Sequence, residues 1–285
     1  MRFVITGAAG MLGQDLVAAA QGAGHEVLAL PRAELDIADR AAVDDALGSA
    51  AADVVVNCAA WTNVDRAETS PDDALAVNGA GAGNVARAAA ASGAWTIHVS
   101  SDYVFDGSKR SPYVESDAVG PVSSYGRSKL AGEREVAAEA PQAHTIVRSS
   151  WLFGAFGPCF PATILRLAGE RDELMVVDDQ VGCPTFTGHL AAALVDLAAR
   201  PSTRPLGIVH VAGGGECSWH EFAREIVAGS GLPCEVKPCT TAEMPRPATR
   251  PAYSVLRTER GAPGLPEWRQ GLAGYVAATR AVSRT

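Results

Sequence analysis

Tyr125 and Lys129 stand four residues apart among small residues in the segment SSYGRSKLAGE, residues 123–133. If this segment is a helix, both side chains lie on one face of it. A free tyrosine has a pKa of about 10, and a fixed ammonium group one turn away favours the phenolate and lowers that pKa. The pair is therefore predicted to supply a proton to a carbonyl oxygen, with Tyr125 as the acid. The alternative is a helix that only packs closely on a sheet.

A glycine-rich segment, TGAAGMLG, places Gly7, Gly10 and Gly13 between a first predicted strand and a first predicted helix. Such glycines allow a tight turn and a close approach of backbone to a pyrophosphate, and the free N–H groups at the start of the helix, around Met11 and Leu12, favour the anion. The segment opens a βαβ unit, which favours a dinucleotide site over a purely structural turn. Lys129 has donors to spare for the nicotinamide ribose.

The second predicted strand, EVLAL, is followed by PRAE instead of the acidic residue that usually holds the ribose of NAD. Arg32 is suited to a 2′-phosphate, which favours NADPH over NADH; a solvated surface arginine is the alternative. Asp36 and Ile37 come next. Asp36 is placed to reach the adenine or, alternatively, to cap the helix ADRAAV.

The third predicted strand ends in NCAAWT, so the cofactor is expected to contact Ala59, Ala60, Trp61 and Thr62 at the carboxyl edge of the sheet. Trp61 is alternatively a core anchor. A fourth strand, AWTIHVS, ends just before Ser101, whose hydroxyl is expected to add a second hydrogen bond to the reacting carbonyl oxygen.

Short apolar runs alternate with longer amphipathic stretches along residues 1–150, which is typical of a doubly wound, Rossmann-like α/β domain with a parallel sheet. A long helix over about 72–91 and another over about 122–139 belong to this pattern. This first part is predicted to be the NAD(P)-binding domain.

After Trp151 the pattern becomes irregular, and residues 151–285 are predicted to form mainly a smaller, interwoven substrate-binding lobe. The sheet is expected to be completed from about 206–231, by a strand at 206–212 and a helix at 219–231 that ends in glycine. The stretch 233–252 carries five prolines and is predicted to be mostly irregular.

Composition narrows the classes of function. The formal net charge of −8 argues against a nucleic-acid partner, since phosphate binding needs a basic face. No apolar run reaches the roughly 20 residues of a membrane-spanning helix, and the first residues do not read as a secretory signal, so we expect a cytoplasmic protein without a membrane partner. The six cysteines show no metal spacing and are expected to be reduced.

Five features in order resemble the extended short-chain dehydrogenase/reductase family: the glycine turn, the NCAA strand end, Asn78 in LAVNGAGAGN, the strand end VSSDYVF and the YxxxK pair. The resemblance implies a ketoreductase with Tyr125 as acid, Lys129 as its partner and Ser101 as a helper. It also implies that Asn78 steadies a helix bend and a water beside the lysine; a simple packing role is the alternative.

Further segments are similar to the dTDP-4-dehydrorhamnose reductases within that family, among them NCAAWTNVDRAE, SSDYVFDG, VRSSWLFG, DDQVGCPT and RPATRPAYSVL. This resemblance implies reduction of the 4-keto group of dTDP-4-dehydro-L-rhamnose by NADPH or NADH. It places Ser101, Asp102 and Trp151 at the sugar. Arg250 is a candidate ligand for the diphosphate, because a guanidinium group takes phosphate oxygens in pairs; a surface salt bridge is the alternative.

The chain departs from that pattern in places. Ser101 stands where threonine is frequent, which keeps the hydroxyl. Pro158 and Cys159 replace asparagines in a loop expected over the substrate, which leaves the sugar open. Some relatives bind magnesium between subunits, but no equivalent glutamates are evident, so no metal is predicted, and the protein is expected to be a monomer or homodimer.

Four rival functions are weighed against this one. A nucleotide-sugar dehydratase carries Thr-Asp-Glu where this chain has Ser101, Asp102 and Tyr103, so the missing glutamate argues against it. A C4 epimerase typically has a small, non-acidic residue at the place of Asp102. A related deoxysugar ketoreductase stays open. A non-catalytic regulatory subunit of the same fold would be expected to have lost the Tyr125–Lys129 pair, which is intact.

Overall fold

The computed structural model describes residues 1–282, and within them six parallel strands form a central sheet in the order β10-β5-β4-β3-β1-β2. The strands are short and apolar on both faces because helices cover both sides. Their bounds are β1 Arg2–Thr6, β2 Glu26–Leu30, β3 Val54–Asn57, β4 Trp95–Ser101, β5 His144–Ser149 and β10 Gly207–His210.

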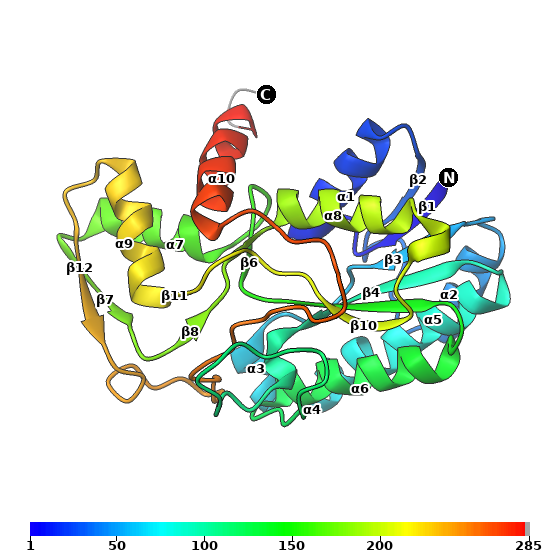
Figure 1. Cartoon of the computed structure of the whole chain (residues 1–285), viewed down its shortest axis with the longest axis horizontal. Helices are drawn as coiled ribbons and strands as arrows, with labels where there is room; N and C mark the ends of the chain where they lie inside the picture. The colour runs from blue at the N-terminus through cyan, green and yellow to red at the C-terminus, as the bar shows by residue number, and fades with distance from the viewer. Residues whose placement is uncertain (283–285) are drawn as a thin grey trace.

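Two layers of helices enclose this sheet (Figure 1). One face packs against α1 (Met11–Gly22) and α8 (Thr187–Ala198), which share an apolar core with β1 and β3. The opposite face packs against α2 (Arg40–Gly48), α5 (Ala82–Ala91) and α6 (Ser124–Glu139). The prediction of a doubly wound parallel sheet is confirmed, and the strand expected at 206–212 joins it beside β5.

The smaller lobe lies at one end of the sheet (Figure 1). Its apolar core is built mainly on Phe153, Phe222 and Trp268. Its elements are β6 Leu152–Phe153, α7 Phe160–Glu170, β7 Glu173–Val177, β8 Val181–Gly182, β9 Thr185–Phe186, β11 Cys217–Ser218, α9 Trp219–Ser230, β12 Glu235–Cys239 and α10 Trp268–Val282. The 3-10 turn η3 Pro201–Thr203 follows α8 in the sheet half.

One sequence expectation is confirmed and one is corrected. The stretch 233–252 is mostly irregular, as predicted, and its strand β12 pairs in parallel with β7 across a register that includes Pro238. The long helix over 72–91 is interrupted: α4 (Pro71–Leu75) passes into a π-helical turn, η1 (Ala76–Gly81), before α5 begins. A π-turn inserts an extra residue and is often found at functional sites. A short α3 (Val64–Thr69) precedes them, and a 3-10 turn, η2 (Asp102–Val104), follows β4.

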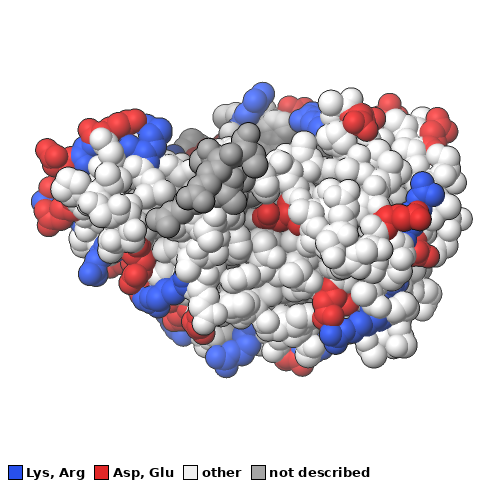
Figure 2. Space-filling view, turned by 90° about the horizontal axis from the view of Figure 1, so that it is seen from above, with Lys and Arg blue, Asp and Glu red and all other residues white. Residues whose placement is uncertain are grey.

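The helix expected at 219–231 is confirmed as α9, which begins after Ser218, whose hydroxyl caps it, and ends at Gly231 with φ +75°. Lysine and arginine are interspersed with aspartate and glutamate on the face seen in Figure 2, and they gather into no extended basic patch there. None of the helices within residues 1–282 has the length and apolarity needed to cross a membrane.

Candidate active site

A cavity of about 720 Å³ opens at the carboxyl ends of the sheet strands. It runs from the glycine turn before α1, past the ends of β3 and β4, to the lobe. This is the edge at which open α/β sheets hold ligands. The cavity therefore joins the predicted cofactor segments to the predicted catalytic pair.

The glycine turn has no room for side chains. Gly7 has φ +66°, and a Cβ there would lie 2.6 Å from the backbone nitrogen of Ala59. A Cβ on Gly13 would lie 2.3 Å from the carbonyl oxygen of Gly7. Gly10 is the N-cap of α1 and supplies no capping side chain. The turn thus exposes the start of α1 to the cavity as a cradle for an anion.

The side chain of Asn57, the last residue of β3, holds the loop that follows this strand. Its Oδ1 accepts hydrogen bonds from the Thr6 hydroxyl at 2.7 Å and from the Ala59 amide at 3.2 Å, and its Nδ2 contacts Nδ1 of His98 at 3.1 Å. The sequence analysis overlooked this role of Asn57. These bonds hold the backbone that the cavity exposes between β3 and α3.

Asn78 lies in the π-helical turn and is buried behind the cavity wall. Its Oδ1 accepts from the Trp61 amide at 2.8 Å, and its Nδ2 donates to the Trp61 carbonyl at 3.0 Å and to the Ser128 hydroxyl at 2.9 Å. A Cβ on Gly132 would lie 2.0 Å from the Asn78 carbonyl oxygen. Asn78 therefore joins the loop after β3 to α6, and it does not line the cavity itself.

Tyr125 faces the cavity from the first turn of α6, with its ring edge-on to that of Tyr103 at 5.5 Å. Burial raises its pKa to about 12, and the nearby Asp102 charge adds to the rise, while a hydrogen bond with Ser101 opposes it. The expected lowering of the Tyr125 pKa by Lys129 is therefore wrong for this structure. A tyrosine in this setting holds its proton across the physiological range.

Lys129 is buried, and its Nζ donates a hydrogen bond of 2.7 Å to the Val99 carbonyl oxygen of β4. Burial lowers its pKa to about 8, an effect that Glu133 and Cys58 oppose. The ammonium group thus lies at the strand end and is close to losing its proton in mildly alkaline solution.

Asp102 is a buried carboxyl group at the end of β4. It accepts hydrogen bonds from the hydroxyls of Ser101 at 3.0 Å, Ser254 at 2.6 Å and Ser150 at 3.3 Å. Within the described chain no lysine or arginine forms an ion pair with it. Burial therefore raises its pKa to about 6, although the three hydroxyls lower it.

Aromatic side chains close the lobe end of the cavity. Trp151, which has φ +47°, stacks face to face on Trp219 with ring centroids 3.5 Å apart. Phe160 packs beside Trp219 at 4.5 Å. A Cβ on Gly182 would lie 2.4 Å from the Trp151 ring, so this glycine admits the indole. The wall offers flat apolar surfaces to a ring-bearing ligand.

Most of the predicted site residues come together here. The cavity is lined by the following of them: Gly7, Gly10, Met11, Leu12, Gly13, Arg32, Asp36, Ile37, Ala59, Ala60, Trp61, Thr62, Ser101, Asp102, Tyr125, Lys129 and Trp151. Arg32 is well exposed and lies 3.6 Å from Asp36. Asp36 does not cap α2, because that cap is the side chain of Asp39.

Arg250 does not line the cavity. Its two terminal nitrogens each donate to one carboxylate oxygen of Asp65, both at 3.1 Å. It also acts on Tyr103, which does line the cavity, and opposes the rise that burial causes in the pKa of that phenol. In this structure Arg250 therefore forms the ion pair given as the alternative, and Tyr103 lies between it and the cavity.

Several lining residues were not singled out from the sequence. In the lobe they come from loops, from β6 and from the starts of α7 and α9, where no local motif marks them. The residues overlooked in this way include Phe156, Phe160 and Trp219 in the lobe and Cys58, Tyr103 and Ser149 in the sheet half. Pro158, which was expected over the substrate, lines the cavity, whereas Cys159 is buried as the N-cap of α7.

Comparisons with known proteins identify relatives over nearly the whole chain. The family model described as RmlD substrate binding domain matches residues 1–281. The chain is 45% identical over 278 residues to a dTDP-4-dehydrorhamnose reductase of Streptomyces griseus, covering 95% of this chain and 91% of that protein. It is 40% identical over 270 residues to a dTDP-4-keto-6-deoxy-D-glucose reductase of Streptomyces niveus, covering 94% and 90%.

A solved structure has the same fold. The dTDP-4-dehydrorhamnose reductase of Bacillus anthracis in complex with NADP superposes with a TM-score of 0.92 at 35% identity, covering 97% of this chain and 98% of that one. The family match spans both the sheet and the lobe. The chain therefore belongs to the dTDP-4-dehydrorhamnose reductase family, as the resemblance of its motifs predicted.

Proposed function

We propose that this protein uses NADPH, or NADH, to reduce the 4-keto group of a dTDP-4-dehydro-6-deoxy-L-sugar, with dTDP-4-dehydro-L-rhamnose as substrate and dTDP-L-rhamnose as product. One observation carries the proposal. A single cavity brings together the glycine cradle, the side chains of Tyr125, Lys129 and Ser101, and an aromatic wall supplied by the lobe.

The residues present fit a dinucleotide. The Gly7 position, which a Cβ would fill, leaves backbone for the pyrophosphate, and the start of α1 supplies its N–H groups. The reduced nicotinamide supplies the hydride that reaches C4 of the sugar. We assign cofactor binding to the sheet half of the chain and substrate binding mainly to residues from Trp151 onward.

Tyr125 is assigned as the proton donor to the sugar oxygen. Because its pKa is raised to about 12, the hydroxyl is protonated at neutral pH and has a proton to give. As C4 gains a hydride, the oxygen on C4 gains this proton, so the ketone becomes an alcohol. Ser101 is assigned a second hydrogen bond to that oxygen, for which its hydroxyl proton must turn away from Asp102. Tyr125 then recovers a proton from solvent.

Lys129 is assigned as the cation beside this reaction. Its ammonium group is fixed by the Val99 carbonyl and has two further protons for hydrogen bonds inside the cavity. In the low dielectric of the site, a positive charge stabilises the anion that Tyr125 becomes after it gives up its proton. This role needs Lys129 to be protonated.

The lobe is assigned to the sugar nucleotide. Trp151 and Trp219 offer stacking surfaces, and Asp102 can accept a hydrogen bond from a sugar hydroxyl at the end of β4. Arg250 can contribute to the diphosphate only by exchanging its partner Asp65, so its role as a phosphate ligand stays a prediction.

A cytoplasmic site of action is part of the proposal, with the protein a monomer or homodimer. All six cysteines are free thiols in the structure, which suits a reducing compartment.

A second substrate deserves the same test, because one relative is named for reduction of dTDP-4-keto-6-deoxy-D-glucose. Pro158 contributes to the cavity wall where the sequence departs from the expected asparagines. A wall without those amide groups offers fewer hydrogen bonds to the sugar, so this loop is where a different configuration would be accepted.

The experiment offers the purified protein NADPH with dTDP-4-dehydro-6-deoxyglucose, before and after treatment of the sugar with a 3,5-epimerase. Oxidation of NADPH only after epimerisation is the expected result. Oxidation without epimerisation would identify the D-sugar reductase instead. Conversion of either sugar with no net loss of NADPH would identify an epimerase and refute the proposal.

A further inference from the structure

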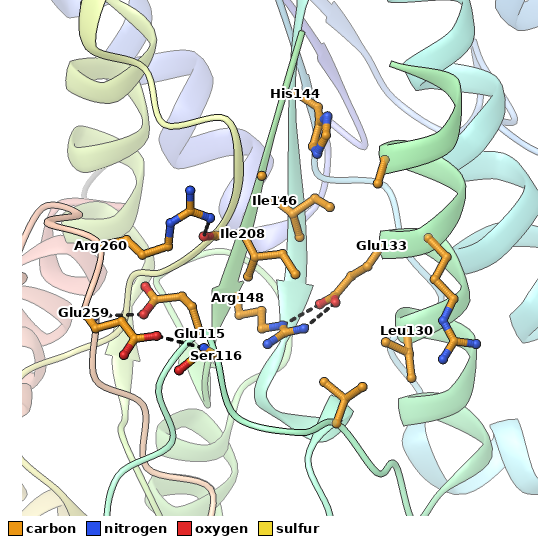
Figure 3. Close-up of a pocket in the computed structure, with 14 residues that line it drawn as sticks. Glu115, Ser116, Leu130, Glu133, His144, Ile146, Arg148, Ile208, Glu259 and Arg260 are labelled. Carbon is orange, nitrogen blue, oxygen red and sulfur yellow. Dashed lines mark hydrogen bonds and ion pairs between the residues drawn. The ribbon is translucent and has the colours of Figure 1, made fainter. Parts of the chain in front are cut away.

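Glu133 lies one helical turn after Lys129 on α6 and is 3% exposed. Its carboxylate accepts three hydrogen bonds. Two come from Arg148 of β5, from Nε at 2.8 Å and Nη2 at 2.6 Å, and the third comes from the Ser100 hydroxyl at 2.6 Å. Figure 3 shows the paired Glu133 and Arg148 between α6 and the sheet.

A buried ion pair is a poor way to stabilise a fold, because desolvation of both charges offsets much of their attraction. Apolar side chains of similar volume would join α6 to β5 as well. Leu130, Ile146 and Ile208 line the same hollow of about 490 Å³ and already provide such apolar contact. The polar cluster therefore points to a role beyond packing.

Ser100 connects this cluster to the site. It stands between Val99, whose carbonyl accepts a hydrogen bond from the Lys129 ammonium, and Ser101, whose side chain acts to lower the Tyr125 pKa. Glu133 lines the hollow between α6 and β5, whereas Ser100 and its two neighbours line the large cavity. A carboxylate outside the ligand cavity thus restrains the end of β4. This strand end carries Val99 and Ser101, the residues that act on Lys129 and Tyr125.

The charge of Glu133 also supports the catalytic pair. The titratable groups that act on Lys129 are Glu133 on its own helix, Cys58 after β3 and His98 on β4, with Arg148 behind Glu133 on β5. Burial lowers the Lys129 pKa and Glu133 raises it, while the pKa of His98 is held well below its usual value. Glu133 is therefore the buried carboxylate that favours the ammonium form.

We propose that Glu133, held by Arg148, is a positioning residue for the proposed reductase: through Ser100 it fixes the end of β4, and by its charge it keeps Lys129 protonated. The proposal rests on the function assigned above. Glu133 contacts neither sugar nor cofactor. Its removal is expected to lower turnover without weakening substrate binding in proportion.

The chain has only three lysines, which makes a direct test feasible. Lys109 pairs with Asp117, Lys237 pairs with Glu173, and Lys129 is the third. Protein carrying ε-¹³C lysine gives one methylene signal for each, and the Lys129→Arg variant assigns the signal of Lys129. Titration of that signal reads the protonation of Lys129 with no substrate present.

The variants are Glu133→Gln and Ser100→Ala, with Glu139→Gln as a control that removes an exposed carboxylate from the same helix. In Glu133→Gln we expect the Lys129 pKa to fall by about one unit and kcat to fall at least about tenfold, with a smaller change in KM. Ser100→Ala keeps the ion pair, and we expect it to lower kcat while the Lys129 pKa changes less. Glu139→Gln is expected to match the wild type in both readouts.

An unchanged Lys129 pKa and kcat in folded Glu133→Gln would overturn the proposal and leave Glu133 a structural residue. If Glu133→Gln does not fold, a wild-type kcat in Ser100→Ala overturns the positioning role. A wild type that reduces no keto sugar would instead refute the proposed function, and the NMR titration would still decide whether Glu133 sets the protonation of Lys129.

Discussion

The Lys129 ammonium donates to the Val99 carbonyl oxygen at 2.7 Å, so it is tied to the strand that carries Ser101. Its burial lowers its pKa to about 8. The titrating group of the catalytic pair in alkaline solution is therefore the lysine, because the pKa of Tyr125 is raised to about 12.

The first prediction follows for the pH dependence of the reaction. We expect kcat/KM for NADPH, which reports the free enzyme, to decline above about pH 8 as Lys129 loses its proton. Initial rates between pH 6 and about 10 measure this limb. In Lys129→Arg, if active, the limb should be absent, since a guanidinium stays charged. A wild-type kcat/KM that stays constant up to about pH 10 would contradict the assignment.

A second prediction concerns Asp102. Folding raises its pKa from 3.8 to about 6, so the fold favours the protonated form. That contribution to the free energy of unfolding is complete below about pH 4 and is lost as pH rises through 6, a loss of about 3 kcal/mol. Denaturant unfolding of wild type and Asp102→Asn at pH 4 and 7 measures it. From pH 4 to pH 7, the free energy of unfolding of the wild type should fall relative to that of Asp102→Asn. A difference between the two proteins that is the same at both pH values would contradict the prediction.

A third prediction explains the small residues of α6. A Cβ on Gly132 would lie 2.0 Å from the Asn78 carbonyl oxygen, which is backbone and cannot rotate away. We expect Gly132→Ala to destabilise the protein by about 2 kcal/mol and to lower turnover by displacing the π-helical turn. The matched control is Gly229→Ala in α9, where a Cβ meets nothing within 4 Å. It should be neutral or stabilising by up to about 1 kcal/mol, and similar losses in both variants would refute the packing argument.

Much of the sheet half was predictable because its signals are local. The glycine turn, the apolar strands and the Tyr125–Lys129 spacing each follow from residues near one another in the chain, and the structure brings them to one cavity. The Tyr125 pKa was not predictable from spacing, because burial and the Asp102 charge decide it. Asn57 and Glu133 act through partners 41 and 33 residues away, which a sequence motif does not reveal.

The lobe was harder to predict because its elements are short. Its strands β6, β8, β9 and β11 have two residues each, too few to show a period. Trp219 reaches the cavity through its stack on Trp151, which no spacing indicates. Pro238 made β12 hard to predict, because a proline argues against a strand. It is tolerated here because the neighbouring strand does not need its missing N–H.

A fourth prediction addresses cofactor choice. Arg32 lines the cavity, is mostly exposed and forms an ion pair with Asp36 at 3.6 Å. Such an exposed pair is weak, so the guanidinium is expected to exchange it for a 2′-phosphate. We expect Arg32→Ala to raise KM for NADPH about tenfold and to leave KM for NADH nearly unchanged, a loss of about 1.4 kcal/mol. Arg40→Ala, an exposed arginine outside the cavity, is the control. An equal change in KM for NADPH and for NADH would show that Arg32 does not recognise the 2′-phosphate.

The most direct test of the proposed chemistry compares wild type with Tyr125→Phe, with NADPH and the epimerised 4-keto sugar supplied to both. The wild type should oxidise one NADPH for each ketone reduced. The variant should bind NADPH with nearly wild-type affinity, measured by fluorescence titration, and lose turnover by at least about 100-fold, because it has no proton to give. Retained turnover in Tyr125→Phe, or sugar conversion without loss of NADPH in the wild type, would contradict the account.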